Sequence, residues 1–169
     1  MNQCLKEKEI YLCKFSEKRE WLEQLSCGHI YTHSVGYYRD LEGSTIINND
    51  FLDLIRSDSD NWYEYFNKFG DFVGIFSVYE LVEKIKEIPS IRYGKVKYFS
   101  DESIDIIKIF NNIYEETCFY KRKNPFAIEN EYRVALYGAY DDPFIVETTQ
   151  FKQFEIFTFD EFFEKKLSN

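Results

Sequence analysis

The chain has 169 residues, of which 44% are hydrophobic, and no linker divides it, so one domain covering residues 1–169 with a single core is expected. The formal net charge of −9 argues against general nucleic-acid binding, because attraction to phosphates supplies most non-specific affinity and this charge repels them. No apolar run approaches the roughly 20 residues that a membrane span needs, which predicts a soluble, cytoplasmic protein.

The first part of the chain alternates between strand and helix patterns. Glu9–Phe15 alternates as a strand does, and Ser16 is a suitable N-cap for a helix that extends to Cys27 and ends at Gly28. His29–Ser34 then alternates again. The pattern predicts a strand, a helix and a second strand.

Both histidines, His29 and His33, fall on one face of the second predicted strand, just after Cys27. This grouping raises the question of a metal site. At 3.3 Å per residue the two histidines are about 13 Å apart along an extended strand, too far to bind one ion. We therefore expect exposed or hydrogen-bonding histidines and no metal site.

The middle of the chain is polar at first and aromatic afterwards. Leu41–Asp60 predicts a loop with a short helix around Phe51–Ile55. The rings between Trp62 and Phe69 are expected to serve core or interface packing. Phe72–Ser77 predicts a buried strand, and Val78–Glu87 predicts a helix.

The last part of the chain adds more strands than helices. Pro89 and Gly94 predict a turn. The order of predicted strands and helices predicts an α+β domain, in which helices flank a central mixed, mainly antiparallel sheet. The remaining predicted strands are Lys95–Phe99, 131–136, Phe144–Glu147 and Phe154–Phe159, and the remaining predicted helices are Glu102 to about Thr117 and Asp160–Lys166.

A basic run, Lys121–Lys123, precedes an alternating stretch that carries both a carboxylate and a guanidinium. In an extended strand Glu131 and Arg133 share one face, while apolar side chains occupy the other. Two interpretations stay open. The pair belongs to an ordinary solvated face of a half-buried strand, or it forms part of a binding or catalytic site.

The order of predicted elements resembles the opening of ADP-ribosyltransferase-like folds, in which three successive elements contribute to an NAD pocket. A second resemblance is to a family of uncharacterised bacterial and phage proteins, whose layout is similar to that of domains found near phage-defence genes. The segments that carry this second resemblance are Gly28–Tyr31, Tyr37–Asp40, Gly70–Phe72, Phe119–Lys121 and Phe126–Arg133.

The transferase resemblance implies a role for each matching position. It requires a His or Arg on the first strand, a Tyr or Ser on the second, and a Glu on a later strand; this chain offers Lys14, then Tyr31 or Ser34, then Glu131. Lys14 departs from the pattern, since an ammonium group lacks the forked donors of a guanidinium. Glu131 would be the catalytic residue. The ligand-binding candidates are Lys14, Tyr31, Ser34, Tyr38, Arg39, Lys121 and Arg133.

These resemblances predict a nucleotide-binding domain of phage or phage-defence origin, which as an ADP-ribosyltransferase-like protein would act on NAD or an NAD-derived ligand. Glu131 and Arg133 would then face the same cleft as Tyr31 and Lys14. The alternative is a non-enzymatic protein of phage origin that binds and inhibits a protein partner or sequesters a ligand. Whether the chain is an enzyme stays open at this point.

Overall fold

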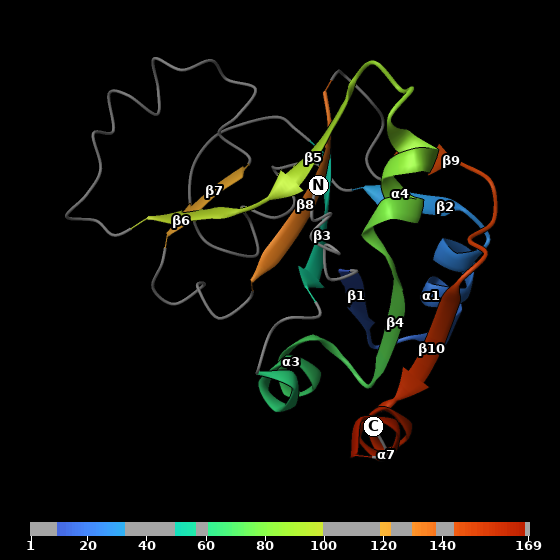
Figure 1. Cartoon of the computed structure of the whole chain (residues 1–169), viewed down its shortest axis with the longest axis vertical. Helices are drawn as coiled ribbons and strands as arrows, with labels where there is room; N and C mark the ends of the chain where they lie inside the picture. The colour runs from blue at the N-terminus through green and yellow to red at the C-terminus, as the bar shows by residue number, and fades with distance from the viewer. Residues whose placement is uncertain are drawn as a thin grey trace, which may run out of the picture.

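The computed structural model describes residues 10–32, 50–56, 61–99, 119–122, 130–137 and 144–167. These residues form an α+β domain whose main element is a six-stranded sheet with helices on both sides (Figure 1). Within the described ranges, no helix is both long and apolar enough to cross a bilayer.

The strands of the main sheet follow the order β10-β4-β1-β3-β8-β5, and every neighbouring pair is antiparallel. Two smaller sheets accompany it: an antiparallel pair of β2 and β9, and a parallel pair of β6 and β7. The bounds are β1 Tyr11–Ser16, β2 His29–Thr32, β3 Asp50–Arg56, β4 Phe72–Ser77, β5 Ile91–Lys95, β6 Lys97–Phe99, β7 Tyr120–Arg122, β8 Glu131–Leu136, β9 Phe144–Glu147 and β10 Phe154–Thr158.

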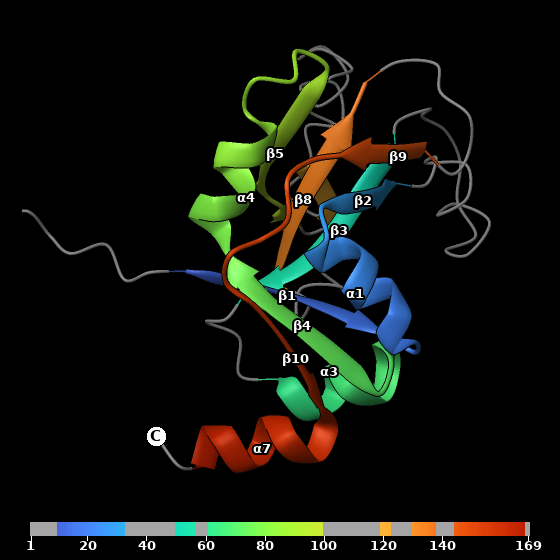
Figure 2. The same ribbon diagram turned by 90° about the vertical axis from the view of Figure 1, so that its right-hand side faces the viewer.

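One face of the main sheet, called here the α1 face, carries Leu12, Phe76, Val134 and Leu136. Helix α1 (Arg19–Ser26), helix α4 (Val78–Ile85) and the β2–β9 pair contribute buried side chains to the same core, and Figure 2 shows these elements on one side of the sheet. The expected apolar side of the 131–136 strand is therefore confirmed as part of the core.

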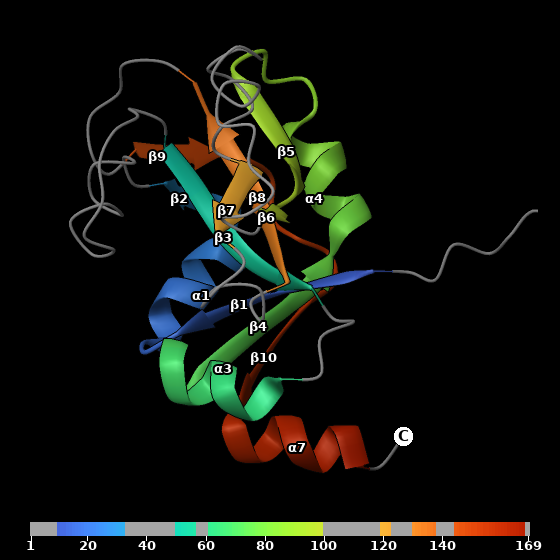
Figure 3. The same ribbon diagram turned by 90° about the vertical axis from the view of Figure 1, so that its left-hand side faces the viewer.

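The opposite face, called here the α3 face, carries Cys13, Phe15 and Val73. Helix α3 (Trp62–Phe69) and helix α7 (Phe159–Leu167) pack on it through aromatic rings, with the centroids of Phe15 and Phe66 4.9 Å apart. Figure 3 shows this side, with the β6–β7 pair lying over β8 and β3. The expectation that the aromatic stretch 62–69 serves packing is confirmed.

Helix α1 confirms the predicted helix but begins later than Ser16. Its N-cap position is Lys18, while the Ser16 hydroxyl accepts a hydrogen bond from the Lys18 N–H at 3.1 Å and donates one to the Lys18 carbonyl at 2.8 Å. Ser16 therefore stabilises the turn between β1 and α1. The predicted stop is correct, because Gly28 has a φ of +97°, which favours glycine.

The short helix expected around Phe51–Ile55 is wrong. This segment is β3, an internal strand of the main sheet paired with both β1 and β8. Apolar residues at 51, 52, 54 and 55 fit the spacing of a helical face as well as that of a strand buried on both sides. Only the neighbouring strands decide between the two.

The turn expected between Pro89 and Gly94 is confirmed at Pro89 and Ser90 but ends before Gly94. Gly94 lies inside β5, directly opposite Arg133 of β8, and β5 ends at Lys95 before the separate strand β6 begins. Strand β7, which pairs with β6, was not predicted. The predicted helix from Glu102 to about Thr117 lies outside the described residues.

The strands at 29–32, 72–77, 144–147 and 154–158 and the helix at 78–85 agree with the sequence predictions within a few residues at each end. Helix α7 starts at Phe159 with a reciprocal cap. The Thr158 N–H donates to the Glu161 carboxylate at 2.8 Å, and the Glu161 N–H donates to the Thr158 hydroxyl at 3.3 Å. Asp160, the predicted start, lies one residue inside the helix.

Candidate functional site

Glu131 and Arg133 form a buried ion pair on the α3 face of β8. Arg133 places its Nε 2.7 Å and its Nη2 2.6 Å from Oε1 of Glu131. The two side chains are 2% and 7% exposed, so neither belongs to a solvated strand face. The expectation that the two side chains lie together is confirmed, and the interpretation of an ordinary solvated face is wrong.

The other carboxylate oxygen of Glu131 is also in contact with a cation. Lys121 of β7 places its Nζ 3.4 Å from Oε2, and the Glu131 N–H donates to the Tyr98 hydroxyl of β6 at 3.0 Å. A carboxylate that is desolvated needs such partners, since burial of an unpaired charge is costly. These contacts fasten the β6–β7 pair to β8.

This geometry makes Glu131 a poor group for contact with a substrate. A catalytic carboxylate must reach the reacting atoms, whereas here one oxygen lies against Arg133, the other lies near Lys121, and the side chain is 2% exposed. In this arrangement two cations flank one buried carboxylate, and Lys121 links β7 to β8 through it.

Lys14 does not lie in a cleft with Glu131, contrary to the expectation from sequence. Strand register aligns Cys13 with Ile55 and Ile55 with Glu131, so Cys13 and Glu131 share the α3 face. Lys14, the next residue after Cys13, therefore points to the α1 face, where its partner on β4 is Gly74.

Tyr31 is separated from Glu131 as well. It lies on β2, opposite Ile145 of β9, and both side chains are 39% exposed, whereas Ile30 and Thr32 on the other side of the strand are buried. The remaining ligand-binding candidates Ser34, Tyr38 and Arg39 lie outside the described residues. The structure thus brings together Glu131, Arg133 and Lys121, but not Lys14 or Tyr31.

Among the described residues, no group of three or more histidine, cysteine, aspartate or glutamate side chains is placed to hold a metal ion. His29 places its Nδ1 2.8 Å from the side-chain oxygen of Gln24, as expected for a hydrogen-bonding histidine. His33 lies outside the described ranges.

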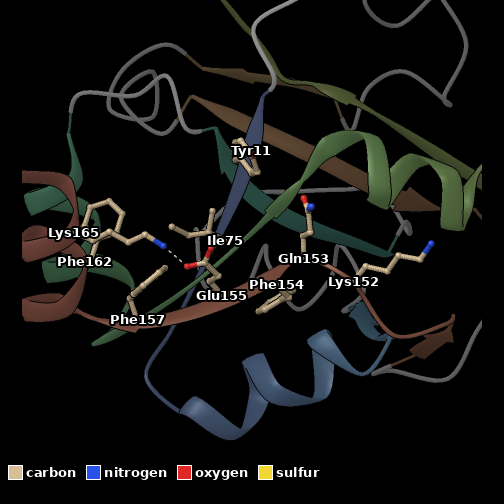
Figure 4. A pocket seen from close by; sticks show the side chains of 9 residues that line it. All are labelled: Tyr11, Ile75, Lys152, Gln153, Phe154, Glu155, Phe157, Phe162 and Lys165. Atoms are coloured by element: carbon tan, nitrogen blue, oxygen red, sulfur yellow. Dashed lines mark hydrogen bonds and ion pairs between the residues drawn. The ribbon is translucent and has the colours of Figure 1, made fainter. Parts of the chain in front are cut away.

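A groove of about 660 Å³ lies where β10 meets α7 (Figure 4). Its volume falls within the range of small-molecule sites, which is about 300–1,000 Å³. Strands β1 and β4 contribute to it, since they lie beside β10 in the sheet. The lining residues are Tyr11, Ile75, Lys152, Gln153, Phe154, Glu155, Phe157, Phe162 and Lys165.

One ion pair lies inside this groove. Lys165 of α7 forms an ion pair with Glu155 of β10, and its Nζ also lies 4.6 Å from the centroid of the Phe157 ring. Figure 4 shows Lys165 extending toward Glu155, whereas Lys152 extends away from the other lining side chains. The groove therefore combines aromatic rings with two lysines, a carboxylate and the amide of Gln153.

The rim of the groove is anchored to α4. Glu80 accepts hydrogen bonds from two consecutive backbone N–H groups, those of Lys152 and Gln153, at 2.5 and 3.2 Å. Lys84 donates to the carbonyl of Gln150 at 2.8 Å. These contacts hold the start of β10 against α4.

No family model, curated protein or solved structure matches this chain in the comparisons. The site must therefore be interpreted from its own chemistry. Sequence reasoning missed the groove, because Tyr11, Ile75 and Lys165 are far apart in the chain and meet only through the order of β1, β4 and β10. A local signal was present in the succession of Phe154, Glu155 and Phe157 before α7.

Proposed function

We propose that this protein binds a nucleotide-like ligand in the groove between β10 and α7 and holds it without chemical turnover. The observation that carries the proposal is the composition of the groove: aromatic rings, an amide, and two lysines of which one is paired with a glutamate, in a volume of about 660 Å³. Each part has a counterpart in a nucleotide.

A base presents a flat ring and a polar edge. Aromatic side chains such as Tyr11 and Phe157 can contact the ring, since stacking is worth about 1–3 kcal/mol per base. The amide of Gln153 offers both a donor and an acceptor for the polar edge. The Lys165 ammonium group can pair with a phosphate oxygen.

The same chemistry favours binding over catalysis. The groove residues include one carboxylate, Glu155, and its partner is already Lys165. Neither a histidine nor a cysteine is among them, so the pair of tuned acid and base groups that proton-transfer catalysis uses is not present among the groove residues. Glu131, the candidate for transferase chemistry, is buried elsewhere in the fold.

Ligand-dependent thermal stabilisation tests the proposal, because a ligand that binds only the folded state raises the melting temperature. The screen uses NAD, ADP-ribose, adenosine monophosphate and triphosphate, and cyclic nucleotides. Wild-type protein is expected to be stabilised by at least one of them. Lys165→Gln and Gln153→Ala should weaken that stabilisation, because both residues line the groove.

Lys86→Gln is the matched control, since Lys86 is an exposed lysine of the segment after α4 that pairs with Glu83 and does not line the groove. It should leave the stabilisation unchanged. The proposal fails if no compound in the series stabilises the wild type, or if the double variant Gln153→Ala/Lys165→Gln is stabilised as strongly as the wild type.

Turnover is measured separately by following nicotinamide release from NAD. The binding proposal predicts that NAD stays intact during incubation with the protein. Release of nicotinamide that Glu131→Gln abolishes, in a variant whose circular dichroism spectrum shows that it is folded, would instead support the ADP-ribosyltransferase-like enzyme.

A further inference from the structure

The charges in the groove limit how much negative charge a ligand can carry. Of the nine lining residues, three are charged: Lys152, Glu155 and Lys165. Lys152 extends away from the other side chains in Figure 4, so the opposed pair of Lys165 and Glu155 faces the ligand. One cation and one anion therefore meet at the position where a phosphate would bind.

Lys165 can exchange its partner at little cost. Its side chain is 51% exposed and that of Glu155 is 60% exposed, and ion pairs at such exposed positions contribute about 0–1 kcal/mol. A phosphate oxygen can therefore replace the Glu155 carboxylate on Lys165. The displaced carboxylate is attached to β10 and stays close to the new anion.

Lys152 points away from the other lining side chains, so a second phosphate meets Glu155 and faces no further cation among the described groove residues in this arrangement. Glu155 lies beside the occupied cation, and the whole chain has a formal net charge of −9, which opposes polyanions. One phosphate gains the contact with Lys165, whereas further phosphates add negative charge beside Glu155 and on the side of the groove from which Lys152 extends away.

We propose, on the basis of the function proposed above, that the groove selects nucleotides with a single phosphate group, and that Glu155 sets this limit. Lys165 is the group that recognises the phosphate. Glu155 acts as its intramolecular competitor and as the group that repels di- and triphosphates.

Isothermal titration calorimetry with adenosine and its mono-, di- and triphosphate tests the inference. The titrations are done at low ionic strength and in the presence of a chelator, because salt and bound Mg²⁺ would hide the ligand charge. The monophosphate should bind more tightly than either adenosine or the triphosphate, with a preference over the triphosphate of about threefold or more, as expected for one uncompensated charge near the surface.

Glu155→Gln should raise the affinity for the triphosphate more than that for the monophosphate, so that the preference shrinks by about threefold. Lys165→Gln should remove the preference for the monophosphate over adenosine. Glu83→Gln is the control: Glu83 is an exposed glutamate of α4 paired with Lys86, and its loss changes net charge by the same amount at a distance from the groove. It should leave the selectivity unchanged.

The inference fails if the triphosphate binds wild-type protein more tightly than the monophosphate, or if Glu155→Gln and Glu83→Gln alter the selectivity equally. In either case binding by itself would still support the function proposed above. If none of the four compounds binds to the wild type, the inference fails, whereas the function proposed above fails only if no compound of the thermal-stabilisation series stabilises the protein.

Discussion

The guanidinium of Arg133 lies 2.6 Å from the carboxylate of Glu131 at a position where the glutamate side chain is 2% exposed. Buried pairs of this kind rely on one another, because the desolvation penalty of each charge is offset only while its partner is present. Lys121 completes the arrangement 3.4 Å from the second carboxylate oxygen. Contacts of Glu131 with Lys121 and Tyr98 join the main sheet to the β6–β7 pair.

Replacement of Glu131 by glutamine should destabilise the protein by about 3–5 kcal/mol, because Arg133 and Lys121 would keep their charges without the buried carboxylate. Urea unfolding followed by circular dichroism measures the loss. The control is Glu23→Gln, whose carboxylate pairs with Arg19 at 3.1 Å on the exposed surface of α1 and should cost less than about 1 kcal/mol. Similar losses in the two variants would contradict a structural role for Glu131.

Gly74→Ala should lower the free energy of unfolding by about 1–3 kcal/mol through overpacking. A methyl group at Gly74 would lie 2.6 Å from Cζ of Phe154, and the Phe154 ring is itself stacked on Phe76 with centroids 5.1 Å apart. The second substitution Phe154→Leu should recover part of the loss by giving the methyl group room.

Gly94→Ala provides the matched comparison for Gly74, since it is also a glycine inside a strand. A methyl group there would meet its nearest neighbour, the ring of Phe119, at 4.0 Å, which is ordinary contact. Denaturant midpoints should therefore change little at Gly94. If Gly94→Ala cost as much as Gly74→Ala, backbone conformation would explain the losses and crowding would not.

Thr158→Ala should destabilise the protein by about 1 kcal/mol at neutral pH, because it removes the side-chain cap of α7. Hydrogen bonds from Thr158 lower the pKa of the Glu161 carboxyl below its usual value of 4.5. A lowered pKa in the folded state contributes stability above the usual pKa that is lost as the pH falls through the lowered one. The backbone N–H bond is the larger cause of the lowered pKa and is kept in the variant. The difference between wild type and variant, measured by thermal unfolding, should therefore shrink in acid only by the part that the hydroxyl contributes, and a difference that grows in acid would argue against the reciprocal cap.

Tyr132→Phe should make the protein less sensitive to alkali. Burial raises the pKa of the Tyr132 hydroxyl to about 12, above the value of about 10 for an unfolded chain. This group contributes stability that is complete below pH 10 and is lost as the pH rises from 10 through 12. Melting temperatures at pH 8 and pH 11 should differ less in the variant than in the wild type. Tyr79→Phe, at a residue that is 71% exposed, should behave as the wild type does.

Sequence patterns correctly predicted those features of the fold that depend only on residues close together in the chain. The alternation from Glu131 to Leu136 correctly separates charged from apolar side chains, and Gly28 correctly ends a helix. The prediction of a short helix within 50–56 was wrong because an internal strand carries apolar residues at both odd and even positions. That pattern resembles the apolar stripe of a helix. The prediction that a turn extends to Gly94 was wrong because a glycine within a strand gives the same sequence signal as a glycine in a turn.

The site was harder to predict than the fold, since sites depend on strand order. Alternation placed Glu131 beside Arg133 but could not show that β6 and β7 would cover them. Lys14 was expected near Glu131, yet the register across β1, β3 and β8 places it on the opposite face of the sheet. The groove depends on three strands that are adjacent in space and distant in sequence.

The position of β10 beside β4 has a consequence for synthesis of the chain. Strand β4 ends at Ser77, but its second neighbour is not available until Thr158 has left the ribosome, so this side of the sheet stays unpaired while about half of the chain is made. The Val73 and Phe76 side chains, which are completely buried in the finished protein, would be incompletely covered during that interval. Completion of β10 is thus the event that gives β4 its second neighbour, and nascent chains stalled before β10 expose apolar surface that the finished protein covers.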